Sequence, residues 1–157
     1  MPIVLHGAKD KLQATACSYM TTSRLGASPM GEMILKIQES AENYLETILI
    51  LKQQKGAVRS IDIANELEFS KPSISVAMKN LRENGFVEMD SAGYITLTDK
   101  GRVIAETMYE RHTWFSNWLI GLGVDPQIAV KDACRIEHVI SAESFDAIRH
   151  SMEKKEI

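Results

Sequence analysis

The sequence has few of the features that would place it in several common classes of protein. Two cysteines, Cys17 and Cys134, occur in 157 residues, too few for the disulfide framework of a small secreted domain. No apolar run approaches the roughly 20 residues of a membrane-spanning helix. Neither sign of charge dominates, because 18 basic residues face 21 acidic ones and leave a net charge of −3. We therefore expect a cytoplasmic protein without a membrane partner, in which only a local basic surface would hold nucleic acid.

Residues 1–33 mix Gly, Ser, Thr and Met without helical or strand periodicity, so we expect a flexible leader there. From residue 34 the sequence becomes helical, with Ile37, either Tyr44 or Leu45, and Ile48 on one apolar face and Gly56 as the end of the helix. Hydrophobic residues make up 45% of the chain and charged residues 25%, which is typical of a globular protein.

The segment VRSIDIANELEFSKPSISVAMKNLRENG, residues 58–85, predicts two short helices joined by a tight turn. Ser60 is expected to cap the first helix, over 61–67. Ser70 is expected to cap the second, with Pro72 in its first turn. Asn84-Gly85 suits a left-handed end of that second helix. This arrangement is a helix-turn-helix.

Two strands are expected next, in FVEMD (86–90) and YITLT (94–98), with SAG as the turn between them. A helix-turn-helix followed by such a hairpin is a winged helix. Helices are then expected over about 100–122, 126–140 and 142–154. The predicted fold class is mainly α, with a winged helix-turn-helix domain over 34–101 and an all-helical domain over 102–157.

The helix that follows Ser70 has the layout of a helix that reads the major groove of DNA. Ile74, Ala77 and Leu81 define its buried face, so the opposite face presents small side chains flanked by cations and hydroxyls. The expected DNA-binding residues are Arg59, Ser70, Lys71, Pro72, Ser73, Ser75, Val76, Lys79 and Arg82. Winged helices also bind other proteins, and this alternative stays open.

The stretch DACRIEHVIS, residues 132–141, places Cys134, Glu137 and His138 within a roughly 100° arc of one helix face. Thiolate, carboxylate and imidazole groups each bind divalent transition metals. The alternative is that Cys134 is a small buried hydrophobic residue while Glu137 and His138 are solvated. The triplet alone does not decide between the two.

Six segments in this order resemble the DtxR/MntR family of metal-dependent transcriptional repressors, in its short form without an SH3-like third domain. These segments are ENYLETI, VRSIDIANEL, KPSISVAMKNL, GYITLTDKG, ERHTWF and DACRIEHVIS, within residues 37–152. The resemblance implies a homodimer that binds palindromic operator DNA when loaded with Mn²⁺ or Fe²⁺, with Zn²⁺ as a further metal in vitro. Carried over position by position, it implies the metal ligands Asn43, Glu46, His112, Cys134, Glu137 and His138.

Two of these residues depart from the family pattern. Asn43 is neutral where the manganese sensors have an aspartate and the iron sensors a methionine, and Cys134 is similar to the iron-sensing branch. Glu42 is turned about 100° from Asn43 on the helix, which makes it a poor substitute. No general base or nucleophile stands out beside the ligands, so we expect no enzyme. The remaining alternative is a winged-helix DNA-binding or protein-interaction dimer without metal regulation.

Overall fold

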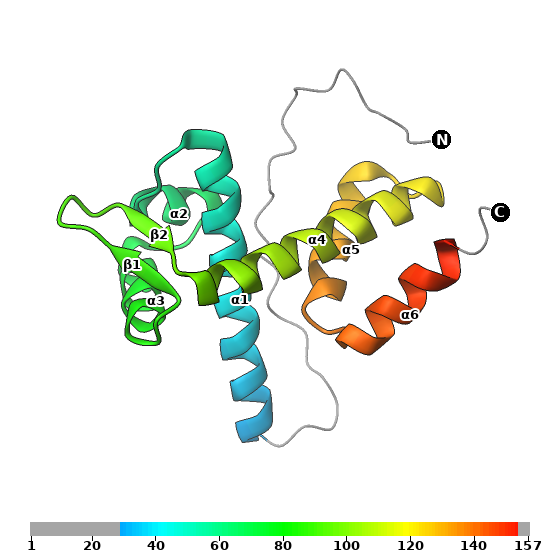
Figure 1. Cartoon of the computed structure of the whole chain (residues 1–157), viewed down its shortest axis with the longest axis horizontal. Coiled ribbons are helices and arrows are strands. Elements are labelled where there is room, and N and C mark those ends of the chain that lie inside the picture. Colours follow the sequence, from blue (N-terminus) through cyan, green and yellow to red (C-terminus); the bar gives the residue numbers. More distant parts are fainter. Residues whose placement is uncertain (1–28, 154–157) are drawn as a thin grey trace.

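The computed structural model describes residues 29–153, and the chain is mainly helical with a two-stranded wing (Figure 1). The elements, in order, are α1 (Pro29–Lys55), α2 (Ser60–Leu67), α3 (Lys71–Glu83), β1 (Val87–Met89), β2 (Ile95–Leu97), α4 (Asp99–Gly121), α5 (Pro126–Glu137) and α6 (Ala142–Glu153). The predicted fold class is confirmed. Among the described helices, none combines the length and apolarity that crossing a membrane requires.

The first helix begins earlier than the sequence suggested. Residues 29–33, which the periodicity assigned to the leader, belong to α1. A helix can begin at Pro29 because the first N–H groups of a helix need no intrahelical acceptor. The rest of the predicted leader, including Cys17, lies outside the described residues.

The helix-turn-helix forms from α2 and α3, with one cap as predicted and one displaced. Ser70 caps α3 by accepting a hydrogen bond from the backbone N–H of Ser73 at 3.3 Å. The N-cap of α2 is Arg59 rather than Ser60. Its backbone N–H donates to the carboxylate of Asp62 at 2.9 Å, so the acidic residue of a capping box fixes where this helix starts.

The wing is an antiparallel pair in which Val87 faces Leu97 and Met89 faces Ile95. It is attached to the residues that precede α2, because the N–H of Ile95 donates to the carbonyl of Val58 at 2.8 Å. Side chains alternate along β2 as predicted, with Ile95 buried and Thr96 exposed.

The core of the winged helix is apolar, and it includes residues of α1, which precedes the helix-turn-helix, and of α4, which follows the wing. Its buried residues are Leu45, Ile48, Leu51, Val58, Ile63, Ala64, Leu67, Ile74, Met78, Leu81, Val87, Ile95 and Ala105. On α3, Met78 is buried where the helical wheel favoured Ala77, which is half-buried. At Gly101 a Cβ atom would overlap the backbone carbonyl oxygen of Phe86, so only glycine lets α4 pass this close to the wing.

Helix α4 joins the winged helix to the C-terminal helices, as Figure 1 shows. Its Ala105 belongs to the first core, whereas Phe115 packs with Ala133 of α5 and Phe145 of α6 in a second, smaller core. The boundary expected near residue 101 stays a prediction. Helix α5 ends at Glu137, three residues before the predicted end, and His138 is its C-cap residue.

Candidate metal centre

Three helices bring the predicted metal ligands together. Helix α1 supplies Asn43 and Glu46, helix α4 supplies His112, and the end of α5 supplies Cys134, Glu137 and His138. Two groups form, in each of which the donor atoms lie within 4.8 Å of one another. The first group is His112, Cys134 and Glu137, and the second is Glu46, Glu137 and His138. Glu137 belongs to both groups, so its carboxylate is the centre of the site.

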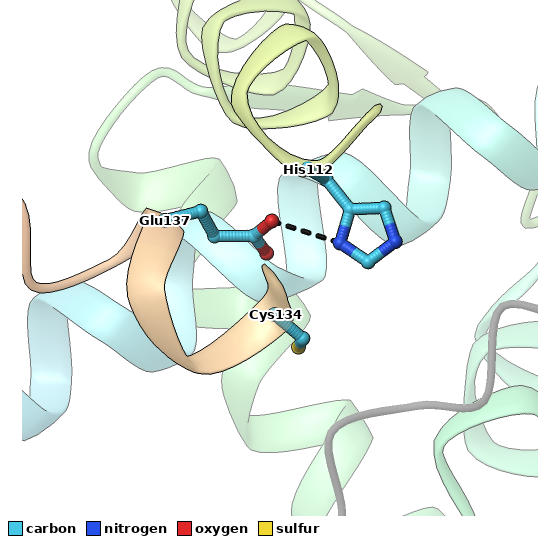
Figure 2. A group of neighbouring side chains, drawn as sticks. All are labelled: His112, Cys134 and Glu137. Atoms are coloured by element: carbon cyan, nitrogen blue, oxygen red, sulfur yellow. Dashed lines mark hydrogen bonds and ion pairs between the residues drawn. The ribbon is translucent and has the colours of Figure 1, made fainter. Parts of the chain in front are cut away.

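The local sequence explains how α5 presents its part of the site. Cys134 and Glu137 are three residues apart on one helix face, and both are buried. The helix ends at Glu137, and His138 follows in the turn, so the two side chains reach different neighbours. Figure 2 shows the first group, with the carboxylate of Glu137 directed at the ring of His112.

Two imidazoles flank the Glu137 carboxylate, which has no exposed surface. Its Oε2 is 2.8 Å from Nδ1 of His112, and its Oε1 is 3.3 Å from Nε2 of His138. A carboxylate buried this deeply needs nearby positive charge or hydrogen-bond donors. The histidines fill that role here, and a cation would fill it more fully.

A negative charge on Glu46 is costly, because its carboxylate is buried beside that of Glu137. Burial raises the pKa of Glu46 from its ordinary 4.5 to about 8, and the nearby Glu137 carboxylate raises it further, against the lowering effect of His112 and His138. Glu46 is therefore largely protonated at neutral pH. Deprotonation becomes favourable when a cation is close by.

Glu42 also belongs to the site, although the sequence reasoning set it aside. Its Oε2 is 3.0 Å from Nδ1 of His138. Burial lowers the pKa of His138, but the hydrogen bond that its ring donates to Glu42 and the nearby charges of Glu137 and Glu42 outweigh that effect, and the net pKa is raised. The sequence analysis weighed Glu42 only as a substitute ligand for Asn43 and did not anticipate this contact with His138.

The angle from Asn43 does not tell whether Glu42 faces α5, and the angle from Glu46 does. At about 100° per residue, Glu42 and Glu46 lie only about 40° apart on α1, whereas Asn43 and Glu46 lie about 60° apart. The face that carries Glu46 toward α5 thus carries Glu42 as well. A wheel centred on Glu46 would have found it.

Arg111 holds the end of α5 in place. Its Nη1 donates to the carbonyl oxygens of Glu137 and Ile140, each at 3.2 Å. These carbonyls are at the carboxyl end of α5, where cations are favourable. Nothing in the local sequence marks Arg111, because its partners are 26 and 29 residues further along the chain.

The residues present fit a divalent transition metal. Oε1 of Glu46 and Nε2 of His138 are buried and make no hydrogen bond with any described residue. Such atoms are normally paired in a folded protein, so both have lone pairs available for a ligand. Carboxylate, imidazole and thiolate donors together suit the mid-row divalent metals better than Ca²⁺ or Mg²⁺.

Asn43 is 9% exposed and lies one helical turn before Glu46. Its amide adds no negative charge, whereas Glu42, Glu46 and Glu137 place carboxylates around His138. Its role as a ligand stays a prediction.

All nine residues predicted to contact DNA are exposed, whereas Ile74, Met78 and Leu81 of α3 point into the core. Val76 is 60% exposed. Arg59 stands slightly apart from the others and stacks on Tyr94, with its guanidinium 4.3 Å from the ring centre. The structure therefore groups eight of these residues on one face of α3 and its cap, with Arg59 beside the wing.

Protein-family models match almost all of the described chain. Residues 36–95 match the N-terminal DNA binding domain of iron dependent repressors, and residues 98–156 match their metal binding and dimerisation domain.

Individual proteins agree with these matches. The transcriptional regulator MntR of Escherichia coli O6:H1 is 37% identical over 112 residues, which are 71% of this chain and 72% of that protein. The regulator MntR of Shouchella clausii is 33% identical over 109 residues, or 69% and 76% of the two chains. The solved structure of the manganese regulator SloR matches with a TM-score of 0.64 at 24% identity. That match covers 72% of this chain and 53% of SloR, so this chain spans about half the length of SloR, and the likeness shows the fold.

Proposed function

This chain belongs to the DtxR/MntR family of metal-dependent transcriptional repressors, and we propose that it is a homodimeric repressor that binds a palindromic operator when Mn²⁺ or Fe²⁺ is bound. Members of the family regulate transcription and are not enzymes, which confirms that part of the sequence prediction. Operator binding would take place in the cytoplasm.

The observation that supports this proposal is that the metal donors come from two different parts of the chain. Glu46 lies on α1, which contributes Leu45 and Ile48 to the winged-helix core, whereas His112 and Glu137 belong to the C-terminal helices. A metal held by both parts would restrict how the winged helix is oriented relative to the dimerisation helices. It favours DNA binding if it binds tightest to the orientation that fits DNA.

The exposed face of α3 supplies the DNA contacts in this proposal. A two-fold dimer that reads successive major grooves needs its recognition helices about 34 Å apart. Lys71, Lys79 and Arg82 would contact phosphates, while Ser73 and Val76 would approach the base edges. Lys79 is 3.8 Å from Glu83, an exposed ion pair that DNA can displace at little cost.

Fluorescence anisotropy with the gene's own upstream DNA tests the proposal under anaerobic conditions at fixed salt. Chelated protein is compared with protein that has received Mn²⁺, Fe²⁺ or Zn²⁺. We expect tight binding with metal only, and the order of the metals would rank the physiological candidates. Equal binding with and without metal would instead support a winged-helix dimer without metal regulation.

Two variants separate the metal site from the DNA surface. Glu137→Ala should abolish the metal response while the protein stays folded, because both donor groups lose their shared carboxylate. Lys79→Ala should weaken DNA binding on any sequence and reduce the dependence on salt by about one counterion. Glu143→Gln removes an exposed charge from α6 and is the control that leaves both properties unchanged.

A further inference from the structure

We infer that Glu42 is a positioning residue of the metal site, which holds His138 so that its Nε2 atom faces the metal. This inference rests on the proposed metal site and adds to it a carboxylate that does not itself bind the ion. The juxtaposition that carries it is a line of three groups: Glu42 Oε2, the His138 ring and Glu137 Oε1.

The two nitrogens of His138 are in different surroundings. Nδ1 is 3.0 Å from Oε2 of Glu42, within hydrogen-bond distance of a strong acceptor. Nε2 is buried, makes no hydrogen bond with any described residue, and lies 3.3 Å from Oε1 of Glu137. With a metal bound, the ring would carry its proton on Nδ1, at Glu42, and would offer its Nε2 lone pair to the metal beside the other donors of the second group.

A carboxylate behind a histidine ligand improves that ligand in two ways. It fixes the tautomer, because Nδ1–H donates to the carboxylate and Nε2 keeps its lone pair. It also makes the imidazole a stronger base, because the partial positive charge that develops on the bound ring is stabilised. His138 has the restricted setting that such a role requires, since only 7% of its side chain is exposed.

Glu42 is itself held in place. Its other carboxylate oxygen, Oε1, accepts a hydrogen bond from Nε2 of Gln38 at 3.3 Å, one turn earlier on α1. Only 15% of the Glu42 side chain is exposed, so solvent screens its charge only partly. Glu42 thereby places a negative charge on the opposite side of the His138 ring from Nε2, on the same helix where Asn43 supplies none.

The contact also connects distant parts of the chain. Glu42 and His138 are 96 residues apart, on α1 and at the end of α5. A change at Glu42 is therefore expected to alter the metal site from the side of the winged helix, without removing a ligand.

The test measures Mn²⁺ affinity by electron paramagnetic resonance of the free ion, in full-length wild type, Glu42→Ala and Glu42→Gln. Glu42→Ala should weaken binding about 10- to 100-fold. Glu42→Gln should lie between the two, because an amide oxygen accepts the hydrogen bond but lacks the charge. Glu88→Gln, which removes a charge from an exposed position of β1, should bind as the wild type does.

A second readout distinguishes positioning from a general structural effect. Long-range ¹H–¹⁵N spectra of the wild type loaded with Zn²⁺, which is diamagnetic, report which nitrogen of His138 carries the proton. We expect a protonated Nδ1 and a metal-bound Nε2. The opposite assignment, or an unchanged affinity in Glu42→Ala, would overturn the inference while leaving the metal site intact. A wild type that binds neither Mn²⁺ nor Zn²⁺ would overturn the proposed function as well.

Discussion

Helix α1 buries two kinds of side chain on two of its faces. Toward the winged helix it buries the apolar residues Leu45, Ile48 and Leu51. Toward α4 and α5 it places Glu42 and Glu46 close to the histidines of the metal centre. Burial of the apolar face stabilises the fold by about 25 cal/mol per Å². Burial of the carboxylates opposes folding until positive charge compensates for it.

The pKa values of Asp62, in the winged helix, and Glu46, in the metal centre, are shifted in opposite directions. Asp62 is near the surface and accepts a hydrogen bond from the Arg59 N–H, which lowers its pKa despite partial burial. Glu46 is buried next to Glu137, and its pKa is raised to about 8. The negative charge of Asp62 therefore stabilises the folded winged helix, whereas a negative charge on Glu46 destabilises the folded protein when no metal is bound.

The largest expected effect belongs to the apolar face. Leu51→Ala leaves a cavity in a core where this side chain is fully buried, and should lower the free energy of unfolding by about 2–5 kcal/mol. Urea denaturation of the chelated protein measures it. Leu122→Ala, at a side chain that is 61% exposed at the end of α4, is the matched control. A loss below 1 kcal/mol for Leu51→Ala would contradict the division between the two faces.

Metal binding at the carboxylates of α1 should raise the free energy of unfolding by nearly as much as Leu51→Ala lowers it. A ligand that binds only the folded state at 100 times its Kd raises the free energy of unfolding by about 2.7 kcal/mol. We expect thermal melting with Mn²⁺ to show this gain, chelation to reverse it, and Glu46→Gln to abolish it. An equal gain in Glu46→Gln would show that Glu46 is not a ligand.

Much of the winged helix could be predicted because local patterns determine it. The cap at Ser70 and the alternation along β2 depend on residues only a few positions apart. At the misplaced cap of α2, a competing local group was present. The carboxylate of Asp62 accepts a hydrogen bond from the backbone N–H of Arg59. The N-cap of α2 is therefore Arg59, and not Ser60 as the sequence suggested.

The metal centre could be predicted only in part from local patterns. Periodicity placed Cys134, Glu137 and His138 on one helix face without deciding their role, whereas their assignment as ligands, with Glu46 and His112, came from the resemblance to a family. Contacts over 26 or more residues leave no local pattern. Glu42 and Arg111, which hold His138 and the end of α5, were therefore missed.

The pH dependence of stability should separate the two kinds of buried surface. The pKa of Glu46 is 4.5 ordinarily and about 8 in the folded protein, so folding takes up a proton between these values. The metal-free protein should lose stability as pH rises through that window, by on the order of 2 kcal/mol. Glu46→Gln has no such proton to bind and should show a flatter profile. Parallel profiles for the two proteins, measured by urea denaturation between about pH 5 and pH 8, would contradict this assignment.

The smallest effect is expected at Asp62, and its sign is opposite. Because the folded pKa of Asp62 is lowered, its carboxylate stabilises the protein above the ordinary value of 3.8, and this contribution is lost as pH falls through the folded pKa. Asp62→Ala removes the cap of α2 and should cost about 1 kcal/mol at pH 7. The difference in the free energy of unfolding between Asp62→Ala and the wild type should become smaller below pH 4, and it should be the same with and without metal.

Asp62→Asn is the control for that measurement, because its amide oxygen can still accept the Arg59 N–H while the charge is absent. It should retain most of the stability that Asp62→Ala loses. If Asp62→Asn were as destabilised as Asp62→Ala, the charge near Lys55 rather than the hydrogen bond would be the main contribution, since that lysine lies 3.0 Å away. Either way, Mn²⁺ affinity should stay unchanged in both variants, because Asp62 lies on the winged-helix side of α1 and belongs to neither donor group.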